Sequence, residues 1–414
     1  MTGLKKAVKI RYYIESLSVY DFKQDEIISA LYDLLSSLDN ETVLVKQSRF
    51  FKLLTNHKSF RHYVSKLILT DDNAFTKAAA AGECDNLDGA ILDGVKSDLY
   101  KLEEIASISA DDICDAQPNE DIAEILKTMP KWNSNGRAML PLTDKWCEHI
   151  DDLKAFHKTN GYGMFAKYVA FTWRNEDFVP ISSVDPISLN DLKNYEIQRQ
   201  KVIDNTQAFI QNLPANNVLL YGDRGTGKSS TVHAILNEYK NQGLRMIEIS
   251  KGDINDLTMI REKLFDSPMK FIIFIDDLSF DSHDDSFGEL KAALEGSLSG
   301  RKSHILIYAT SNRRHLIKEN FSDRENDVNR SDTLQEELSL SDRFGLSITF
   351  VNPDKADYLD IVEKIARDRK LECDYQRLFD SAEQWARRRA GRSPRCAKQF
   401  IDYVEGCIKR GIDW

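Results

Sequence analysis

Eight consecutive residues of the 414-residue chain, at 222–229, read G-D-R-G-T-G-K-S and match the pattern G-x-x-x-x-G-K-[ST]. An apolar run at 218–221 precedes them and a helical pattern at 230–240 follows. Such glycines let successive backbone N–H groups face one phosphate group, and the N-terminus of the following helix adds partial positive charge. The residues that we expect to bind nucleotide phosphates are Gly222, Asp223, Arg224, Gly225, Thr226, Gly227, Lys228, Ser229 and Ser230.

Two residues of this motif have more specific expected roles. Lys228 would reach the outer phosphates and take part in catalysis, and the Ser229 hydroxyl would hold Mg²⁺. An ordinary glycine-rich turn is the alternative, which the strand before and the helix after disfavour.

Two acids follow another apolar run. Residues 271–275 read F-I-I-F-I, as in a buried strand, and Asp276 and Asp277 come next. The carboxyl end of a central parallel strand faces the ligand crevice of an α/β sheet. We expect Asp276 to be an outer-shell ligand of Mg²⁺, and Asp277 to orient or deprotonate the attacking water. Two exposed acids that merely end a strand are the alternative.

A further apolar strand, at 305–309, ends in the polar residues T-S-N. Asn312 is the first candidate to hold the water beside the γ-phosphate, and Thr310 is the second. Arg343 stands in S-D-R-F-G just before the last apolar strand. An arginine there can stabilise charge on a transferring phosphoryl group, and an ion pair with Asp342 is the alternative.

Five arginines lie close together near the C-terminus, at positions 387, 388, 389, 392 and 395. A basic cluster can bind nucleic acid, but a polyphosphate fits this context better. Arg395 follows Pro394 and so lies in the first turn of a helix, where we expect it to sense the nucleotide. For the other four, a solvated or intersubunit surface is the default expectation.

Composition limits the class of protein. With 42% hydrophobic and 29% charged residues, the chain is typical of soluble globular proteins, and no apolar run is long enough to cross a membrane. Six scattered cysteines favour reduced thiols in the cytoplasm. The net charge of −10 argues against broad nucleic-acid binding but leaves a local basic patch open.

Hydrophobic periodicity divides the chain into four segments. Residues 1–160 are expected to form a mainly helical domain, 161–184 a connecting segment, 185–352 an α/β domain and 353–414 a small helical domain. Alternating strands and helices in the third segment predict a parallel five-stranded sheet. Its strands are expected at 217–221, 245–250, 271–275, 304–310 and 346–350.

The order of these motifs resembles that of the AAA+ ATPases, including Arg343 in its D-R-F-G context and a G-x-x-x-R pattern at 391–395. More narrowly, the chain resembles a bacterial family of AAA+ proteins catalogued as domain-of-unknown-function family 815, over about 165–410. The resemblance is carried by N-N-V-L-L-Y-G at 216–222, R-G-T-G-K-S-S at 224–230, D-D-L-S-F at 276–280, Y-A-T-S-N-R-R-H-L at 308–316 and S-L-S-D-R-F-G-L at 339–346.

The resemblance implies an AAA+ P-loop core with a C-terminal helical lid, which binds ATP and Mg²⁺. It also implies a homo-oligomer in which Arg343 reaches the nucleotide of the adjacent subunit and Arg395 links the phosphate state to the lid. Tyr195, in the segment 191–196, is a candidate wall for the adenine. Most AAA+ enzymes have Glu where this chain has Asp277, whose shorter side chain allows slow, switch-like hydrolysis.

These features lead to one expected function and two alternatives. We expect Mg-dependent ATP hydrolysis that remodels or loads an unknown protein partner, bound through the N-terminal helical region. The main alternative is a slow-turnover molecular switch or adaptor, in one form associated with DNA; the polar loop at 281–287, which lacks an aromatic–glycine pore signature, is compatible with it. A P-loop kinase is a third class, which the separate helical C-terminal domain disfavours.

Overall fold

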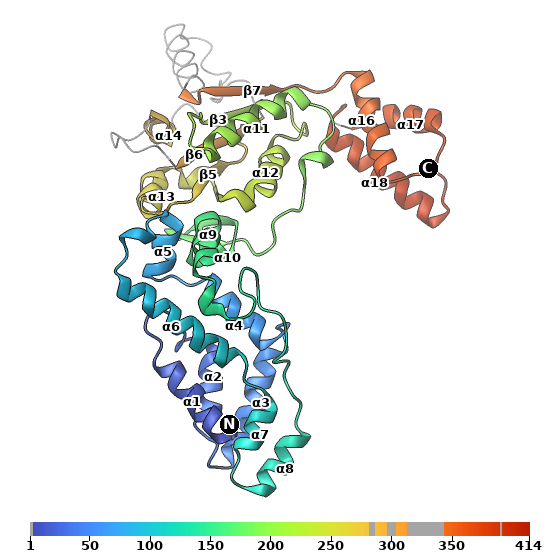
Figure 1. Cartoon of the computed structure of the whole chain (residues 1–414). Helices are drawn as coiled ribbons and strands as arrows, with labels where there is room; N and C mark the ends of the chain where they lie inside the picture. Colours follow the sequence, from blue (N-terminus) through green and yellow to red (C-terminus); the bar gives the residue numbers. More distant parts are fainter. Residues whose placement is uncertain (1–2, 281–285, 296–303, 313–342, 390) are drawn as a thin grey trace. The chain divides into compact units, whose positions relative to one another are not determined.

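The computed structural model describes residues 3–280, 286–295, 304–312, 343–389 and 391–414 (Figure 1). The chain divides into two compact units, Met1–Lys167 and Tyr168–Trp414. Of the residues named in the sequence analysis, 281–285 of the polar loop and 313–316 and 339–342 of the family motifs, including Asp342, lie outside the described residues. None of the helices in the described part has the length and apolar character needed to span a bilayer.

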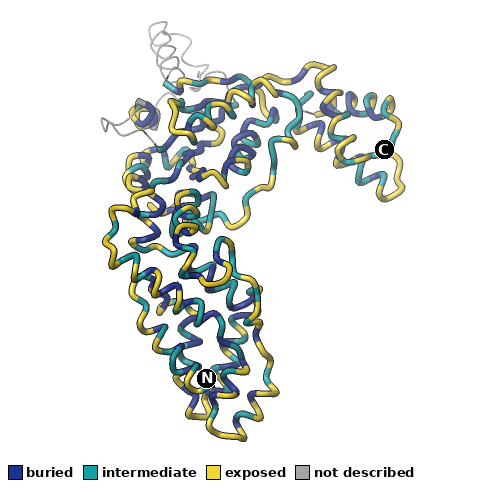
Figure 2. Tube along the Cα trace, viewed as in Figure 1, coloured by how far each residue is buried: buried dark blue, intermediate teal, exposed yellow. Residues whose placement is uncertain are grey.

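The first unit is built from helices that bury one face each, so that buried and exposed residues alternate along them (Figure 2). Polar side chains begin several of these helices; Asp25, for example, accepts hydrogen bonds from the backbone N–H groups of Ile27 and Ile28. Its core includes Phe50, which packs edge-on against Phe60 and Trp132. The helices are α1 (Gly3–Glu15), α2 (Glu26–Leu35), α3 (Thr42–Leu54), α4 (Phe60–Leu69), α5 (Ala74–Ala81), α6 (Gly89–Ala106), α7 (Ala110–Ala116), α8 (Glu120–Thr128), α9 (Ile150–Asn160) and α10 (Gly163–Lys167).

The second unit contains a seven-stranded sheet in the order β2-β1-β4-β5-β6-β3-β7. All neighbouring strands are parallel except β1 and β2, which are antiparallel. The predicted α/β class, with a helical region before it and a helical lid after it, is confirmed. The strands are β1 (Ala170–Arg174), β2 (Asp177–Pro180), β3 (Val218–Gly222), β4 (Leu244–Ile249), β5 (Lys270–Ile275), β6 (Ile305–Ser311) and β7 (Leu346–Phe350).

The prediction of five strands was too low by two. β1 and β2 lie within 161–184, the segment expected to connect two domains, and β1 pairs with the edge of β4. Asn175 and Glu176 join them with positive φ angles of 51° and 59°, which suits a two-residue hairpin. Glutamate is unusual at such a φ, so the sequence around it does not read as a tight turn.

Helices pack on the sheet and form the lid. The core of the second unit joins Val202 and Phe209 of α11 with Val232 and Ile235 of α12 against the central strands. The lid has an apolar core of its own, which includes Phe400. The main helices are α11 (Glu196–Ile210), α12 (Lys228–Tyr239), α13 (Leu257–Leu264), α14 (Ser286–Glu295), α16 (Lys355–Asp368), α17 (Tyr375–Arg387) and α18 (Pro394–Arg410).

Candidate functional site

The register of three parallel strands brings the predicted site residues to one edge of the sheet. β6 lies between β5 and β3, with Ile275 opposite Ala309 and Leu220 opposite Thr310. Because the carboxyl ends of parallel strands share an edge, the acidic pair, the polar strand tip and the loop before α12 converge there.

Two glycines shape the loop between β3 and α12. Gly222 has a φ of 124°, and a Cβ atom there would lie 2.1 Å from the carbonyl oxygen of Phe350. Gly227 caps α12 with a φ of 93°, and a Cβ atom there would meet no other atom within 4 Å. The loop therefore presses against β7 on one side and leaves open space beside the helix N-terminus, where an anion would meet N–H groups.

Lys228 is a buried cation whose direct acceptors are all neutral. Its side chain is 5% exposed. Its Nζ donates to the carbonyl oxygens of Gly222 and Asp223, at 3.0 and 2.7 Å, and to Oδ1 of Asn312 at 3.0 Å. Burial lowers the pKa of Lys228, and nearby carboxylates oppose the shift. Within the described residues no carboxylate forms an ion pair with Lys228, so its charge is available to an anion.

Asp276 lies against two hydroxyl groups. Its Oδ1 accepts hydrogen bonds from Ser229 Oγ, at 2.6 Å, and from Thr310 Oγ1. Thr310 Oγ1 in turn accepts from the backbone N–H of Asp277 at 3.0 Å. Thr310 therefore joins the two acids to each other. The sequence had suggested a different role for Thr310, as the second candidate to hold the attacking water.

Asp277 and Asn312 also lie together. Asp277 has a φ of 52°, in the left-handed region, where a residue other than glycine costs about 1 kcal/mol or more. Asn312 Nδ2 donates to Asp277 Oδ1 at 2.6 Å, and its Oδ1 accepts from Lys228. The amide of Asn312 thus connects the buried cation to the second acid and fixes the orientation of both.

Two predicted residues, Tyr195 and Arg395, border this site. Tyr195 is 7% exposed, and its hydroxyl donates to the carbonyl oxygen of Val351 at 2.7 Å; burial raises its pKa. The backbone N–H of Arg395 donates to the carbonyl oxygen of Gly225 at 3.1 Å. Arg343 is not brought to this site: it is partly buried just before β7, at the amino ends of the parallel strands and therefore at the opposite edge of the sheet.

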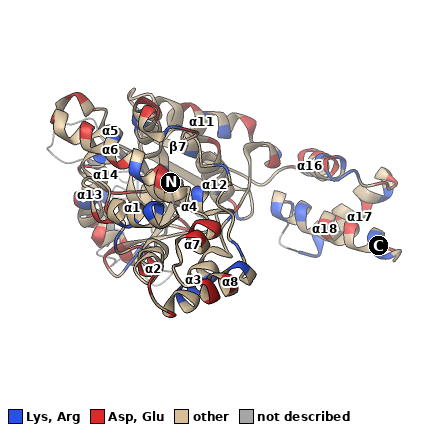
Figure 3. Cartoon of the chain, turned by 60° about the horizontal axis from the view of Figure 1, so that its bottom comes forward, with Lys and Arg blue, Asp and Glu red and all other residues tan. Residues whose placement is uncertain are grey.

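The other lid arginines differ from one another. Arg387 and Arg388 are exposed, and the Arg389 guanidinium lies 4.2 Å from the centre of the Trp385 ring. Arg392, expected on a solvated or intersubunit surface, instead donates to Oε1 of Glu383 at 2.8 Å. Acidic and basic residues are interspersed on the lid helices (Figure 3).

Two contacts of the phosphate loop were not predicted from the sequence. Asp223 Oδ2 accepts from the backbone N–H of Asn352 at 2.7 Å and so ties the loop to the end of β7. The Ser393 hydroxyl would lie 3.0 Å from a Cβ atom at Gly225. No local pattern signals either contact, because both join segments that are more than a hundred residues apart in the chain.

Comparison with known proteins identifies the family. A family model described as "Protein of unknown function (DUF815)" matches residues 166–408. The chain belongs to this family. The resemblance predicted from the motifs, over about 165–410, is thereby confirmed.

Other proteins resemble this DUF815 chain over shorter stretches or more remotely. A probable mitochondrial chaperone BCS1-A of Dictyostelium discoideum is 35% identical over 111 residues, which are 26% of the chain and 25% of that relative. A variant of RuvB from Thermotoga maritima shares 17% identity over 56% of the chain and 68% of its own, with a TM-score of 0.39. The RuvB Holliday junction branch migration motor of that organism shares 18% identity over 56% of the chain and 68% of its own, with a TM-score of 0.37.

The donor set at the sheet edge suits magnesium only together with a ligand that brings its own oxygens. Among the described residues no three His, Cys, Asp or Glu side chains are grouped to hold a metal ion. Asp276 and Ser229 offer two adjacent oxygens. Mg²⁺ commonly takes one or two carboxylates and completes its shell with water and phosphate oxygens, so these residues fit a metal that arrives with a phosphate.

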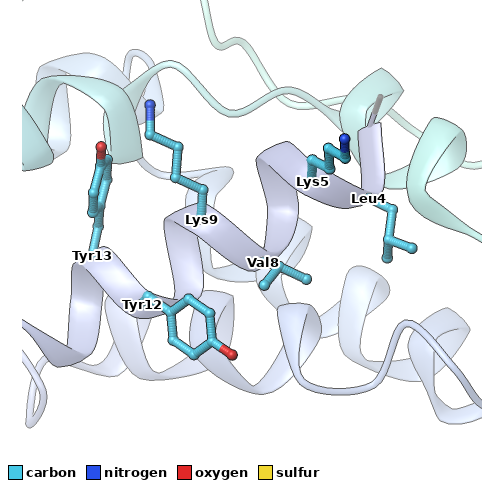
Figure 4. A pocket seen from close by; sticks show the side chains of 6 residues that line it. All are labelled: Leu4, Lys5, Val8, Lys9, Tyr12 and Tyr13. Atoms are coloured by element: carbon cyan, nitrogen blue, oxygen red, sulfur yellow. The ribbon is translucent and has the colours of Figure 1, made fainter. Parts of the chain in front are cut away.

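A second concave surface of the DUF815 chain lies along α1 and lacks the acidic residues of the first site. A groove of about 480 Å³ runs along α1 and is lined by Leu4, Lys5, Val8, Lys9, Tyr12 and Tyr13 (Figure 4). Tyr12 is 55% exposed and Leu4 48%. The lining residues include no acid, histidine or cysteine, so this groove offers a contact surface and no catalytic groups.

Proposed function

We propose that the chain binds ATP and hydrolyses its terminal phosphoanhydride bond, and that turnover remodels or loads a protein partner. The observation that carries the proposal is Lys228, a buried cation held only by neutral acceptors beside an open helix N-terminus. A phosphate group would supply the missing negative charge. Lys228 would then exchange carbonyl acceptors for phosphate oxygens, and the N–H groups of 222–230 would bind the remaining oxygens.

Asp276 and Ser229 are the residues proposed to hold magnesium. When bound, Mg²⁺ neutralises phosphate charge and orients the group that is transferred. The short contact between the Ser229 hydroxyl and the Asp276 carboxylate supports this role, because it holds both oxygens in place beforehand.

Asp277 and Asn312 are proposed to manage the attacking water. Asp277 would orient the water and accept its proton, while Asn312 holds the carboxylate. The water oxygen bonds to the γ-phosphorus, the bond from phosphorus to the bridging oxygen breaks, and its electron pair leaves with ADP. The proton passes from Asp277 to solvent or to the released phosphate.

Arg343, Arg395 and Tyr195 are proposed to complete the site. Arg343 would act on the nucleotide of a neighbouring subunit in a homo-oligomer, and Arg395 would report the phosphate state to the lid. The backbone contact between Arg395 and Gly225 supports the second role. Tyr195 would form a wall for the adenine ring.

A slow molecular switch is the second candidate function. One Asp277 oxygen is already bonded to Asn312, and the backbone at Asp277 is in a strained region. Both features limit how this short side chain can approach a water molecule. A turnover number well below about 1 s⁻¹, with tight ATP binding, would favour the switch over the motor.

We propose the N-terminal unit as the region that binds the protein partner. The exposed apolar residues along α1 support a contact there (Figure 4). All six cysteines are free, in agreement with a reducing compartment, which we propose is the cytoplasm. The net charge of −10 does not favour DNA as the partner.

The direct test compares Lys228→Ala with the wild type in a thermal shift assay with Mg-ATP. At one hundred times Kd a ligand stabilises the folded state by about 2.7 kcal/mol, so the wild type should shift clearly and the variant little. Lys201→Ala, which removes an exposed lysine of α11, is the matched control and should behave as wild type. Equal shifts in all three proteins would contradict the phosphate-binding role.

A further inference from the structure

The lid contains a buried acid that the proposed reaction does not use. Glu383 lies on α17 and is 6% exposed. Its Oε1 accepts from Nε and Nη2 of Arg392, at 3.1 and 2.8 Å. Its Oε2 is buried without a hydrogen-bond partner among the described residues, and two further cations lie near the carboxylate: Lys355 Nζ is 4.0 Å from Oε2, and Arg387 Nε is 3.8 Å from Oε1. Burial of an unpaired carboxylate is unfavourable, and Arg392 is the principal partner of Glu383 because it donates both hydrogen bonds.

Arg392 lies on the short turn that joins α17 to α18. Gly391 precedes it with a φ of 97°, and Ser393 follows as the N-cap of α18, with its hydroxyl accepting from the backbone N–H of Cys396 at 3.2 Å. The turn is therefore fixed by the helix cap on one side and by Glu383 on the other.

The same turn touches the phosphate loop. The backbone N–H of Arg395 donates to the carbonyl oxygen of Gly225 at 3.1 Å. A Cβ atom at Gly225 would lie 3.0 Å from the Ser393 hydroxyl and 3.3 Å from Cβ of Arg395. The approach is so close that a displacement of the turn by an ångström would break the contact.

We propose that Glu383 is a positioning residue for nucleotide binding. Through Arg392 it holds the turn so that Arg395 stays beside the phosphate loop, and it thereby sets the affinity for a nucleoside triphosphate. This inference rests on the proposed function. The lid has an apolar core of its own that includes Leu378, Phe400 and Ile401, so the ion pair is not what holds the lid together.

A double-mutant cycle tests this chain of contacts. The dissociation constant of a fluorescent ATP analogue is measured with Mg²⁺ for the full-length wild type, Glu383→Ala, Arg395→Ala and the double variant. Each single change should weaken binding by about tenfold, and the double variant should bind no more weakly than Arg395→Ala, because contacting groups in one path are not additive. Glu383→Gln, whose amide oxygen can still accept from Arg392, should restore part of the affinity.

A purely structural role gives a different result. If Glu383 only stabilised the lid, the two losses would multiply to about a hundredfold, as for independent sites, and the inference would be overturned. Unchanged affinity in Glu383→Ala would also overturn it. Glu363→Ala is the matched control, because Glu363 lies on α16 of the same lid and pairs with Arg367, away from the turn.

Two further results keep the test decisive. If Glu383→Ala loses the lid fold, seen without nucleotide by hydrogen exchange of α17, Arg392→Lys replaces it in the cycle, since lysine keeps the charge but loses the two parallel N–H donors. Wild-type protein that binds no ATP analogue would overturn the proposed function and this inference together. Binding by the wild type with multiplying losses would overturn this inference alone.

Discussion

The N-terminal helical unit and the sheet unit both hold carboxylates by short hydrogen bonds, but they do so differently. Asp98 in α6 is 0% exposed. Its oxygens accept from the backbone N–H groups of Ser18, Val19 and Tyr20, at 2.8, 2.7 and 3.2 Å, and from Lys101 Nζ at 3.3 Å. This acid is enclosed and saturated, and it fixes the chain path before α2.

The acids at the sheet edge are neither enclosed nor saturated. Asp276 and Asp277 are exposed, and their recorded side-chain partners are a serine, a threonine and an asparagine. Lys228, whose charge interacts with both acids, donates its hydrogen bonds to neutral acceptors. A carboxylate whose oxygens are all hydrogen-bonded and buried has a structural role. Accessible carboxylates beside the phosphate loop and its lysine indicate a binding site.

The largest expected effect comes from Arg343, in the sheet unit. Arg343→Ala should bind Mg-ATP nearly normally and hydrolyse it about 10³-fold or more slowly, since an arginine that stabilises a transferring phosphoryl group contributes about 10³ to 10⁵ in rate. Steady-state phosphate release measures the rate, and Arg388→Ala, which changes an exposed lid arginine, should retain activity.

A mixture of Arg343→Ala with Lys228→Ala tests whether the arginine acts between subunits. A mixed interface joins an intact phosphate loop to an intact arginine, so part of the lost activity should return. If the two variants co-assemble and no activity returns, Arg343 acts within its own chain or in a local ion pair.

Asp277 should show the next largest effect. Asp277→Asn keeps the shape and the contact with Asn312 but cannot accept a proton, so ATP affinity should stay within about threefold while turnover falls about 10²-fold. Equilibrium binding and single-turnover hydrolysis separate the two quantities. Asp266→Asn, at an exposed position, serves as control, and an unchanged rate in Asp277→Asn would assign proton transfer to another group.

Asp98 should affect stability and not ATP chemistry. Asp98→Ala removes the acceptor of three backbone N–H groups, of which that of Tyr20 is buried, so we expect a loss of about 3 kcal/mol in the stability of the N-terminal unit. Hydrogen exchange of α6 measures it in the full chain. Asp93→Ala, exposed on the same helix, should change stability by less than about 0.5 kcal/mol. Loss of ATP binding in folded Asp98→Ala would contradict the conclusion that Asp98 has a structural role only.

The smallest effect is expected at Asp71, a carboxyl that is neither saturated nor part of a site. Burial raises the pKa of Asp71 to about 6, and the charges of Asp72 and Asp21 add to the shift; Asn73 donates to it at 2.6 Å and opposes the shift. An unfolded aspartate titrates near pH 4, so the folded state binds the extra proton between about pH 4 and 6. Its stabilising contribution is full below about pH 4 and is lost as pH rises through about 6.

Asp71→Asn mimics the protonated acid and should remove this dependence. Relative to the wild type, the variant should gain about 1 kcal/mol of stability between pH 4 and 7, discounted for partial exposure. The difference in unfolding free energy between the two proteins is measured at a series of pH values, with hydrogen exchange of α4 and α5 as the probe. A constant difference across this range would show that Asp71 titrates normally.

The sequence alone determined the features that depend on neighbours along the chain. The glycine spacing around Lys228, the acids after the apolar run at 271–275 and the arginine in the first turn of α18 are local patterns, because backbone reversal, strand ends and helix starts are set by adjacent residues. The resemblance to the family rested on the same motifs, and the match over 166–408 confirms it; the α/β class followed from the alternation of strands and helices, and the sheet confirms it.

Only the tertiary structure decided which of these residues touch. Thr310 reaches Asp276 because β6 lies beside β5 in one register, and β1 and β2 join the sheet because β4 offers an edge. The pairing of Glu383 with Arg392 depends on how α17 and the following turn pack. Strand order, register and helix packing are set by contacts between distant segments, which no local pattern in the chain encodes.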